Sequence, residues 1–178
     1  MEKFEATNMQ LVKKCRLGDR KAQFLLFRQY SKAMYNIAMR FLNNKMDAED
    51  ILQESFVTAF LKLPELKNDN HFGSWLKKIV INNCLNALRK KQHFFKDLKM
   101  DLVSDESEDN GNLKSRTDPA VLHQAIKELP VGGRTILTLY ALEEYKHREI
   151  AEILNVSEST SRTQYKRALG ILQKKLKN

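Results

Sequence analysis

Glycine, proline and cysteine are scarce in this chain. Its 178 residues include six glycines and three prolines, which is few for a protein made of β-strands joined by tight turns. The two cysteines, Cys15 and Cys84, belong to no Cys-x-x-Cys pair and to no Cys/His cluster. No zinc site is therefore indicated, and two buried, reduced thiols are expected. The scarcity of turn-forming residues favours an all-α fold.

Long apolar runs are also absent. No stretch approaches the roughly 20 apolar residues of a membrane helix, and the first ten residues, MEKFEATNMQ, lack the apolar core of a signal peptide. The sequence therefore predicts a cytoplasmic protein without direct membrane insertion. It contains no metal-ligand cluster, phosphate-binding loop or nucleophile constellation that we can identify, so we expect neither a cofactor nor catalysis.

Positive charge, by contrast, is in excess. The chain has 31 Lys and Arg against 22 Asp and Glu, a net charge of +9. Such a surplus fits a polyanionic partner, most often nucleic acid, but it also serves solubility alone. The location of the charge along the chain must decide between these interpretations.

Apolar periodicity and capping residues predict several helices. Gly18-Asp19 is typical of a helix break followed by an N-cap, and apolar residues then recur at helical spacing to about residue 43. Two more helices are predicted over 47–63, with an acidic first turn, and over about 74–91. Further helices are expected near 119–128 and after Pro130.

The composition changes in the middle of the chain. Residues 102–118, LVSDESEDNGNLKSRTD, contain five acids, two cations and no apolar period. This pattern predicts a flexible acidic linker, with an interaction tail as the alternative. We therefore expect two small helical domains, over 1–97 and 118–178, joined by a linker over 98–117, with four helices in the second.

The most specific local pattern is a helix-turn-helix over about 146–175. Ile150 and Leu154 share one face of a short helix, Asn155 stands where the turn needs a left-handed residue, and Ser157 is a candidate N-cap. From Ser159 to the end there are six Lys and Arg and no acid. The candidate DNA contacts on this second helix are Ser159, Thr160, Arg162, Thr163, Lys166 and Arg167.

A helix lined with Ser, Thr and Arg suits the major groove, where Arg reads guanine edges and Lys holds phosphates. The alternative is a solvated basic face on an ordinary helical hairpin. The turn residue, the cap and the acid-free face occur together, which favours DNA binding. The motif does not say which class of DNA-binding protein this is.

Helix 47–63 carries a candidate binding surface. Its expected buried stripe is Leu52, Phe56, Ala59, Phe60 and Leu63. The carboxylates of Asp50 and Glu54 lie on the opposite side and are bordered by Ile51 and Leu61. Acids bordered by aliphatic side chains suggest a protein-docking face. A solvated acidic face is the alternative. A di-metal carboxylate site normally needs Glu-x-x-His pairs, and this helix has no His.

Helix 74–91 carries a second candidate binding surface. Leu76, Val80, Cys84 and Ala87 are expected to point inward. The side chains expected to point outward are Trp75, Lys78, Asn82, Asn86 and Arg89. Amides, cations and an aromatic on one stripe make a plausible nucleic-acid surface, although a Trp such as Trp75, taken alone, is more often a core residue.

Several short motifs follow one another in a fixed order. They are LGDRKA (17–22), DAEDILQESF (47–56), FGSWL (72–76), IVINN (79–83), LP (129–130), EIAEIL (149–154) and SESTSR (157–162). The series covers nearly the whole chain and resembles an RNA polymerase sigma factor of the sigma-70 family, in the small extracytoplasmic-function (ECF) subgroup. Three positions depart from the family pattern: Asn155 replaces the usual Gly, Ser161 stands where Val is common, and Gly132-Gly133 replaces a charged pair.

The resemblance implies roles for the candidate residues. The first domain would be sigma region 2, and its docking residues on the β′ clamp helices of the polymerase would be Asp47, Asp50, Ile51, Gln53 and Glu54. The residues implied at the minus-ten element, including capture of a flipped base, are Asn70, His71, Phe72, Trp75, Lys78, Asn82, Asn83, Asn86 and Arg89. The second domain would be region 4, which contacts the β flap and reads the minus-thirty-five element through its second helix.

The resemblance also implies core RNA polymerase, promoter DNA and an anti-sigma factor as partners, no catalysis, and a monomer when free. Two other classes stay open on the residues alone. A conventional helix-turn-helix regulator usually binds palindromes as a dimer, but no clear dimerisation helix follows the motif. A nucleic-acid-processing enzyme would need a catalytic constellation, and we find none in the sequence.

Overall fold

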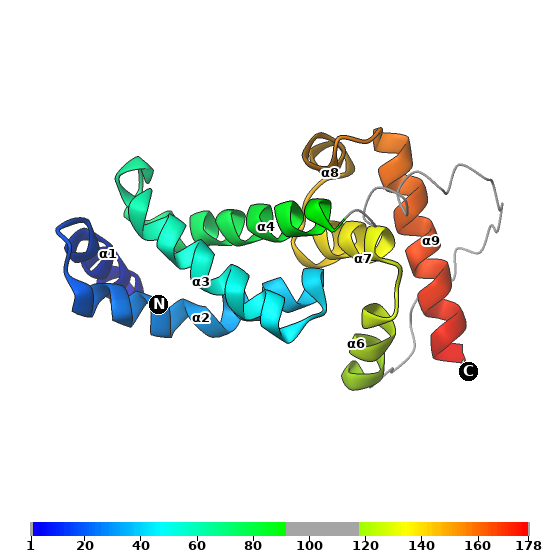
Figure 1. Cartoon of the computed structure of the whole chain (residues 1–178), viewed down its shortest axis with the longest axis horizontal. Coiled ribbons are helices and arrows are strands. Elements are labelled where there is room, and N and C mark those ends of the chain that lie inside the picture. Colours follow the sequence, from blue (N-terminus) through cyan, green and yellow to red (C-terminus); the bar gives the residue numbers. More distant parts are fainter. Residues whose placement is uncertain (1, 92–117, 178) are drawn as a thin grey trace. The chain divides into compact units, whose positions relative to one another are not determined.

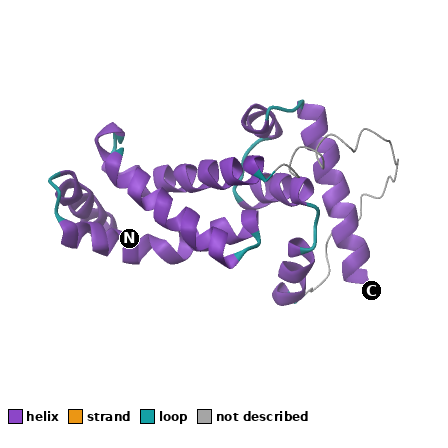
Figure 2. Cartoon of the chain, in the orientation of Figure 1, coloured by secondary structure: helices purple, strands orange, loops and turns teal. Residues whose placement is uncertain are grey.

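The computed structural model describes residues 2–91 and 118–177, in which every regular element is a helix (Figures 1 and 2). The all-α prediction is thus confirmed, and the predicted linker over 98–117 lies outside the described residues. The chain divides into two compact units, Met1–Ala87 and Leu88–Asn178. Within the described ranges, no helix has both the length and the apolar character needed to span a bilayer.

Four helices form the first unit: α1 (Glu2–Arg16), α2 (Arg20–Leu42), α3 (Lys45–Leu61) and α4 (Phe72–Lys90), whose last turn crosses the division between the units. Two short 3-10 turns, η1 (Leu63–Glu65) and η2 (Asp69–His71), connect α3 to α4. The predicted helices are present, but α3 ends two residues earlier than expected. Leu63 is buried from the first 3-10 turn instead, where Pro64 is accommodated at the start of a new element.

Local side-chain chemistry sets the boundaries of α2. The Asp19 carboxylate accepts hydrogen bonds from the backbone N–H groups of Lys21 (2.8 Å) and Ala22 (3.1 Å), which confirms the predicted N-cap. The helix ends at Asn43 in the left-handed conformation, with φ 50°. The next residue, Asn44, accepts from the N–H of Asp47 and begins α3. Two adjacent asparagines therefore end one helix and start another.

Gly18 is the hinge of the α1–α2 turn, with φ +81°. A Cβ at this position would meet no atom within 4 Å, so Gly18→Ala should destabilise the first unit through backbone strain alone, by about 1 kcal/mol. Gly170→Ala is the matched control, because its Cβ is equally free and it lies inside α9 (Glu158–Lys177). Alanine should instead stabilise that helix by up to about 1 kcal/mol. Urea denaturation measures both changes, and a Gly18→Ala variant as stable as the wild type would refute the argument.

Buried apolar and aromatic side chains join the helices of the first unit. Phe27 packs edge-on against Phe56 at 4.8 Å between ring centroids, and Tyr30 packs against Phe72 at 5.4 Å. These contacts link α2 to α3 and to α4. The two cysteines are buried and free, as predicted. Burial raises the pKa of the Cys15 thiol to about 11 and that of Cys84 to about 12, so both are protonated at neutral pH.

The second unit contains α6 (Pro119–Lys127), α7 (Val131–Leu137), a π-helical turn η3 (Thr138–Leu142), α8 (His147–Leu154) and α9. The four predicted helices are therefore present, and α7 begins directly after Pro130 despite its two glycines. Figure 1 shows α9 running the length of this unit, and it packs against α6, α7 and α8. The residues of the core cluster are Ala125, Leu129, Leu137, Ala168 and Leu172.

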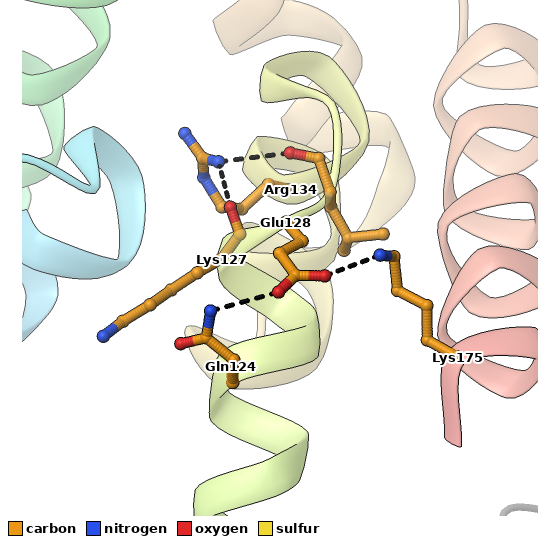
Figure 3. A network of polar contacts seen from close by, with 6 residues as sticks. Gln124, Lys127, Glu128, Arg134 and Lys175 are labelled. Carbon is orange, nitrogen blue, oxygen red and sulfur yellow. Dashed lines mark hydrogen bonds and ion pairs between the residues drawn. The ribbon is translucent and has the colours of Figure 1, made fainter. Parts of the chain in front are cut away.

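A polar network fixes α6 against its neighbours (Figure 3). The Glu128 carboxylate accepts from the Gln124 amide at 3.1 Å and from the Lys175 ammonium of α9 at 2.6 Å. The Lys175 hydrogen bond lowers the pKa of Glu128 below its usual range. The Arg134 guanidinium of α7 donates to the carbonyl oxygens of Lys127 and Leu129 at the end of α6. The two Arg134 bonds satisfy backbone carbonyl groups at or just beyond the last turn of α6.

Candidate nucleic-acid interface

The helix-turn-helix forms as its sequence predicts. Asn155 adopts the left-handed conformation at φ 54° and ψ 51° and ends α8. The Ser157 hydroxyl accepts from the N–H of Thr160 at 3.0 Å, which is the contact of an N-cap at the start of α9. Ile150 and Leu154 are fully buried on the inner face of α8. The turn and both helix ends are therefore fixed by contacts within the motif.

The two faces of α9 differ as expected. The side chains of Ser161, Gln164, Ala168 and Leu172 are buried. The predicted DNA contacts lie away from this core: Ser159, Arg162, Thr163 and Lys166 are exposed, and Thr160 and Arg167 are half-buried. This exposed side of α9 has the polar and basic character that phosphate and base edges require.

Two contacts on this surface were not anticipated from the sequence. The exposed Arg162 guanidinium forms an ion pair with Glu158, one turn earlier on α9. The Thr160 hydroxyl lies 2.7 Å from the Ser157 hydroxyl, so this side chain takes part in the cap. Glu158 immediately precedes the acid-free stretch that begins at Ser159, so that stretch gave no sign of this ion pair. Arg162 must exchange this carboxylate for DNA if it binds a base.

A buried polar pair joins α8 to α9. The Nδ1 atom of His147 lies 2.9 Å from the Ser161 hydroxyl, and both side chains are buried. The imidazole ring stacks on Tyr140 at 4.1 Å between centroids and meets Tyr165 edge-on at 5.7 Å. Ser161 faces the core, at the position where Val is common in the family, and its hydroxyl has a partner there.

This histidine should make the stability of the second unit depend on pH. Burial, and next the positive charge of Arg162, lower the pKa of His147 below 6.5, while Glu158 opposes the shift. The folded state therefore resists protonation more than the unfolded chain, so stability is complete above pH 6.5 and is lost as the pH falls below it. Thermal melting from pH 7.5 to 5 should show a steeper loss in the wild type than in His147→Gln. Equal losses in the two proteins would contradict the assignment.

In the first unit, α1 holds the loop that precedes α4. The Arg16 guanidinium donates to the Asp69 carboxylate at 2.7 Å and to the carbonyl oxygen of Leu66 at 2.5 Å. The Asn68 side chain accepts from the N–H of Asn70 and starts the 3-10 turn η2. Residues far apart in the sequence thus fix the conformation of this loop. The sequence pattern alone predicts only that the loop is polar.

A pocket of about 230 Å³ opens between this loop and the first turns of α4. It is lined by Leu66, Lys67, Asn68, His71, Ser74, Trp75 and Lys78. Three of these, His71, Trp75 and Lys78, are candidates predicted from the sequence, and the structure brings them together. The sequence did not single out the other four as candidates: Ser74 is on α4 itself, and Leu66, Lys67 and Asn68 lie in the loop before it, which Arg16 contacts at Leu66 and Asp69.

Two residues predicted to contact DNA, Phe72 and Asn83, pack against other helices of the first unit instead. Phe72 is only 1% exposed and packs against Tyr30, so it belongs to the core. Asn83 is half-buried and its amide donates to the buried Ser55 hydroxyl of α3 at 3.0 Å. Both lie on the inner side of α4, where a rotation of about 100° per residue also places Leu76 and Val80. The other candidates, Asn70, Asn82 and Asn86, are exposed, and Arg89 is half-buried.

The outer face of α3 mixes acids with apolar side chains. Asp50, Gln53 and Glu54 are exposed and Asp47 is half-buried, whereas Ile51 is 7% exposed and is not part of this face. Leu61 is exposed, as predicted, and two apolar residues not predicted, Met46 and Val57, are exposed on the same side of α3 at 75% and 59%. At about 100° per residue, these three side chains lie within about 40° of Asp50. The outer face of α3 therefore combines exposed apolar side chains with its acids.

Comparison with known proteins identifies both units. A family model described as sigma-70 region 2 matches residues 26–94, and one described as sigma-70, region 4 matches residues 120–172. The RNA polymerase sigma factor SigV of Bacillus subtilis is 32% identical over 146 residues, which cover 81% of this chain and 84% of SigV. The RNA polymerase sigma-H factor of Pseudomonas aeruginosa is 28% identical over 95% of this chain and 93% of its own.

Related proteins include an ECF sigma factor, and a solved structure shares the fold. The ECF RNA polymerase sigma factor SigW of Bacillus subtilis is 28% identical over 94% of this chain and 95% of SigW. The sigma factor RpoE of Bartonella quintana, solved with the anti-sigma factor NepR, has a TM-score of 0.55 at 19% identity and covers 86% of this chain and 95% of its own. The chain belongs to the sigma-70 family of RNA polymerase sigma factors, in the ECF group, whose members direct the polymerase to promoters.

Proposed function

We propose that this sigma factor binds core RNA polymerase through α3, opens and reads the minus-ten element with α4 and the loop before it, and reads the minus-thirty-five element with α9. The observation that carries the proposal is the exposed, basic side of α9, which has no acid after Glu158, within a well-formed helix-turn-helix. The chain would act in the cytoplasm and supply no catalysis of its own. The reaction would belong to the polymerase.

The docking role of α3 rests on the composition of its outer face. Exposed Met46, Val57 and Leu61 share this face of α3 with Asp50, and a merely solvated acidic face would not need such apolar residues. Interfaces commonly combine an apolar centre with charged groups that set orientation. The occupant we propose is the clamp helices of the β′ subunit, with Asp50, Gln53 and Glu54 as the polar contacts. Contact of the second unit with the β flap is part of the same proposal.

The pocket before α4 is proposed to hold an unstacked base of the minus-ten element. It offers an indole, a neighbouring imidazole and two lysines, together with amide and hydroxyl groups. Removing a base from the duplex costs a few kcal/mol, which stacking and hydrogen bonds to its edge can offset. The exposed amides of Asn82 and Asn86 extend this surface along α4.

Trp75→Ala in the reconstituted holoenzyme should reduce promoter opening, because stacking on an aromatic side chain contributes about 1–3 kcal/mol per base. Opening can be followed with a fluorescent base analogue in the minus-ten element. On a promoter whose minus-ten element is already mismatched, Trp75→Ala should reduce opening less than on fully paired DNA. Asn36→Ala, an exposed position on α2, serves as the control. Unchanged opening by Trp75→Ala would refute the base pocket.

The division of labour follows the two matched regions. We propose that residues 1–97 act as region 2, residues 118–178 as region 4, and residues 98–117 as the linker that separates the two promoter contacts. We further propose that an anti-sigma factor holds the protein inactive and that the free protein is a monomer. Two proteins that share this fold were solved in complexes, RpoE with the anti-sigma factor NepR and CnrH with the cytosolic domain of CnrY.

DNA binding with and without core polymerase tests the proposal. The free protein should bind duplex DNA weakly and with little sequence preference, and the complex with core polymerase should bind selected fragments specifically. A conventional helix-turn-helix regulator should instead bind a palindrome tightly as a dimer without polymerase. Specific binding by the protein alone, or no complex with core polymerase, would overturn the proposal.

A further inference from the structure

The contact between His147 and Ser161 lies at the joint of the helix-turn-helix. His147 is the first residue of α8, and Ser161 is in the first turn of α9. The 2.9 Å bond between them therefore connects the supporting helix to the helix that carries the proposed DNA contacts. Arg162 is the next residue after Ser161, so anything that fixes Ser161 also fixes where Arg162 projects.

The imidazole ring is itself held in place. Tyr140 of η3 stacks on it at an interplanar angle of 15°, and Tyr165 of α9 packs against it edge-on. The charged groups that influence it, Arg162 and Glu158, are both on α9. Tyr140 and Tyr165 also pack on each other at 4.6 Å between centroids, so the imidazole belongs to a cluster of three rings. A ring held in this way presents its Nδ1 atom in one direction, and a hydrogen bond weakens as it departs from linear geometry. Apolar contacts carry no comparable directional preference.

We propose that His147 is a positioning residue for promoter recognition, and that its bond to Ser161 sets the rotation of α9 about its own axis. This inference rests on the proposed function, in which Arg162 reads the minus-thirty-five element. A side-chain tip lies about 6 Å from the helix axis, so a rotation of about 10° moves it by about 1 Å. A bidentate contact with a guanine edge does not tolerate such a shift.

A double-substitution cycle separates positioning from stability. Each single variant, His147→Phe or Ser161→Ala, leaves one buried polar partner without its bond, which is destabilising. The double variant His147→Phe/Ser161→Val removes both polar groups, keeps an aromatic ring against the two tyrosines, and should recover most of the thermal stability. If the pair only stabilised the fold, the double variant would also recover promoter discrimination.

The measurement uses holoenzyme reconstituted from the full chain and core polymerase. The probes are a promoter that the wild type transcribes and the same promoter with its minus-thirty-five element scrambled. We expect the double variant to melt near the wild-type temperature and yet to discriminate between the two promoters about tenfold less well, as for the loss of one good base contact. Wild-type discrimination by the double variant would overturn the positioning role. Failure of the wild type to transcribe any promoter would instead refute the proposed function.

Discussion

Arg162→Ala should cost the holoenzyme about 1–3 kcal/mol of preference for its minus-thirty-five element, the value of one good bidentate contact between arginine and guanine. Arg162 is exposed near the start of α9, and its free-state partner is the glutamate one turn earlier. Exposed i,i+4 ion pairs contribute only about 0.3–0.5 kcal/mol. Exchanging Glu158 for a base edge therefore costs little, and the loss of preference should report the DNA contact.

The chain offers a matched control for this variant. Arg148 on α8 is also exposed and also pairs with a glutamate four residues later, Glu152, at 3.5 Å. Arg148→Ala removes the same charge and the same type of ion pair. Transcription from promoters altered one base at a time in the upstream element measures both variants. If Arg162→Ala keeps the wild-type preference at every position, Arg162 does not contact a base.

Asp50→Lys should weaken association with core polymerase by about tenfold or more while leaving the upstream sequence preference unchanged. Asp50 is exposed on the face of α3 that also carries the exposed apolar side chains of Met46, Val57 and Leu61. A reversed charge at the centre of a complementary interface costs several kcal/mol when it meets a like charge. Since Asp50 is exposed, the variant should fold normally.

Glu49→Lys is the control for Asp50→Lys. It makes the same change in net charge on the neighbouring residue, which is about 100° around the helix from Asp50 and pairs with Lys45. Titration of labelled protein with core polymerase gives both dissociation constants. Equal weakening by the two variants would indicate an effect of net charge alone, and no weakening by Asp50→Lys would remove α3 as the docking surface.

Features that depend on neighbouring residues were predictable from the sequence. The Asp19 cap, the left-handed Asn155 and the Ser157 cap each follow from contacts within a few residues. The same holds for the exposed side of α9, because its core residues recur at helical spacing. The helix ends were predicted less accurately. At the end of α3, for example, Leu63 is buried from a 3-10 turn and not from the helix.

Tertiary contacts account for what the sequence did not predict. Phe72, Asn83 and Ile51 were expected on binding surfaces because motif or spacing placed them beside polar residues, but packing against other helices buries them wholly or partly. Met46 and Val57 were overlooked for the opposite reason, since apolar residues were assumed to be buried. The pocket before α4 and the bond between His147 and Ser161 join residues that no local pattern relates.

Transcription in vitro tests the central claim most directly. Core RNA polymerase would be mixed with the wild-type protein on fragments of genomic DNA, and the 5′ ends of the transcripts would be mapped by sequencing. We predict discrete start sites, absent with core polymerase alone, that share two upstream elements at a fixed separation. Transcripts identical to those of core polymerase alone would contradict the claim that this chain confers promoter specificity.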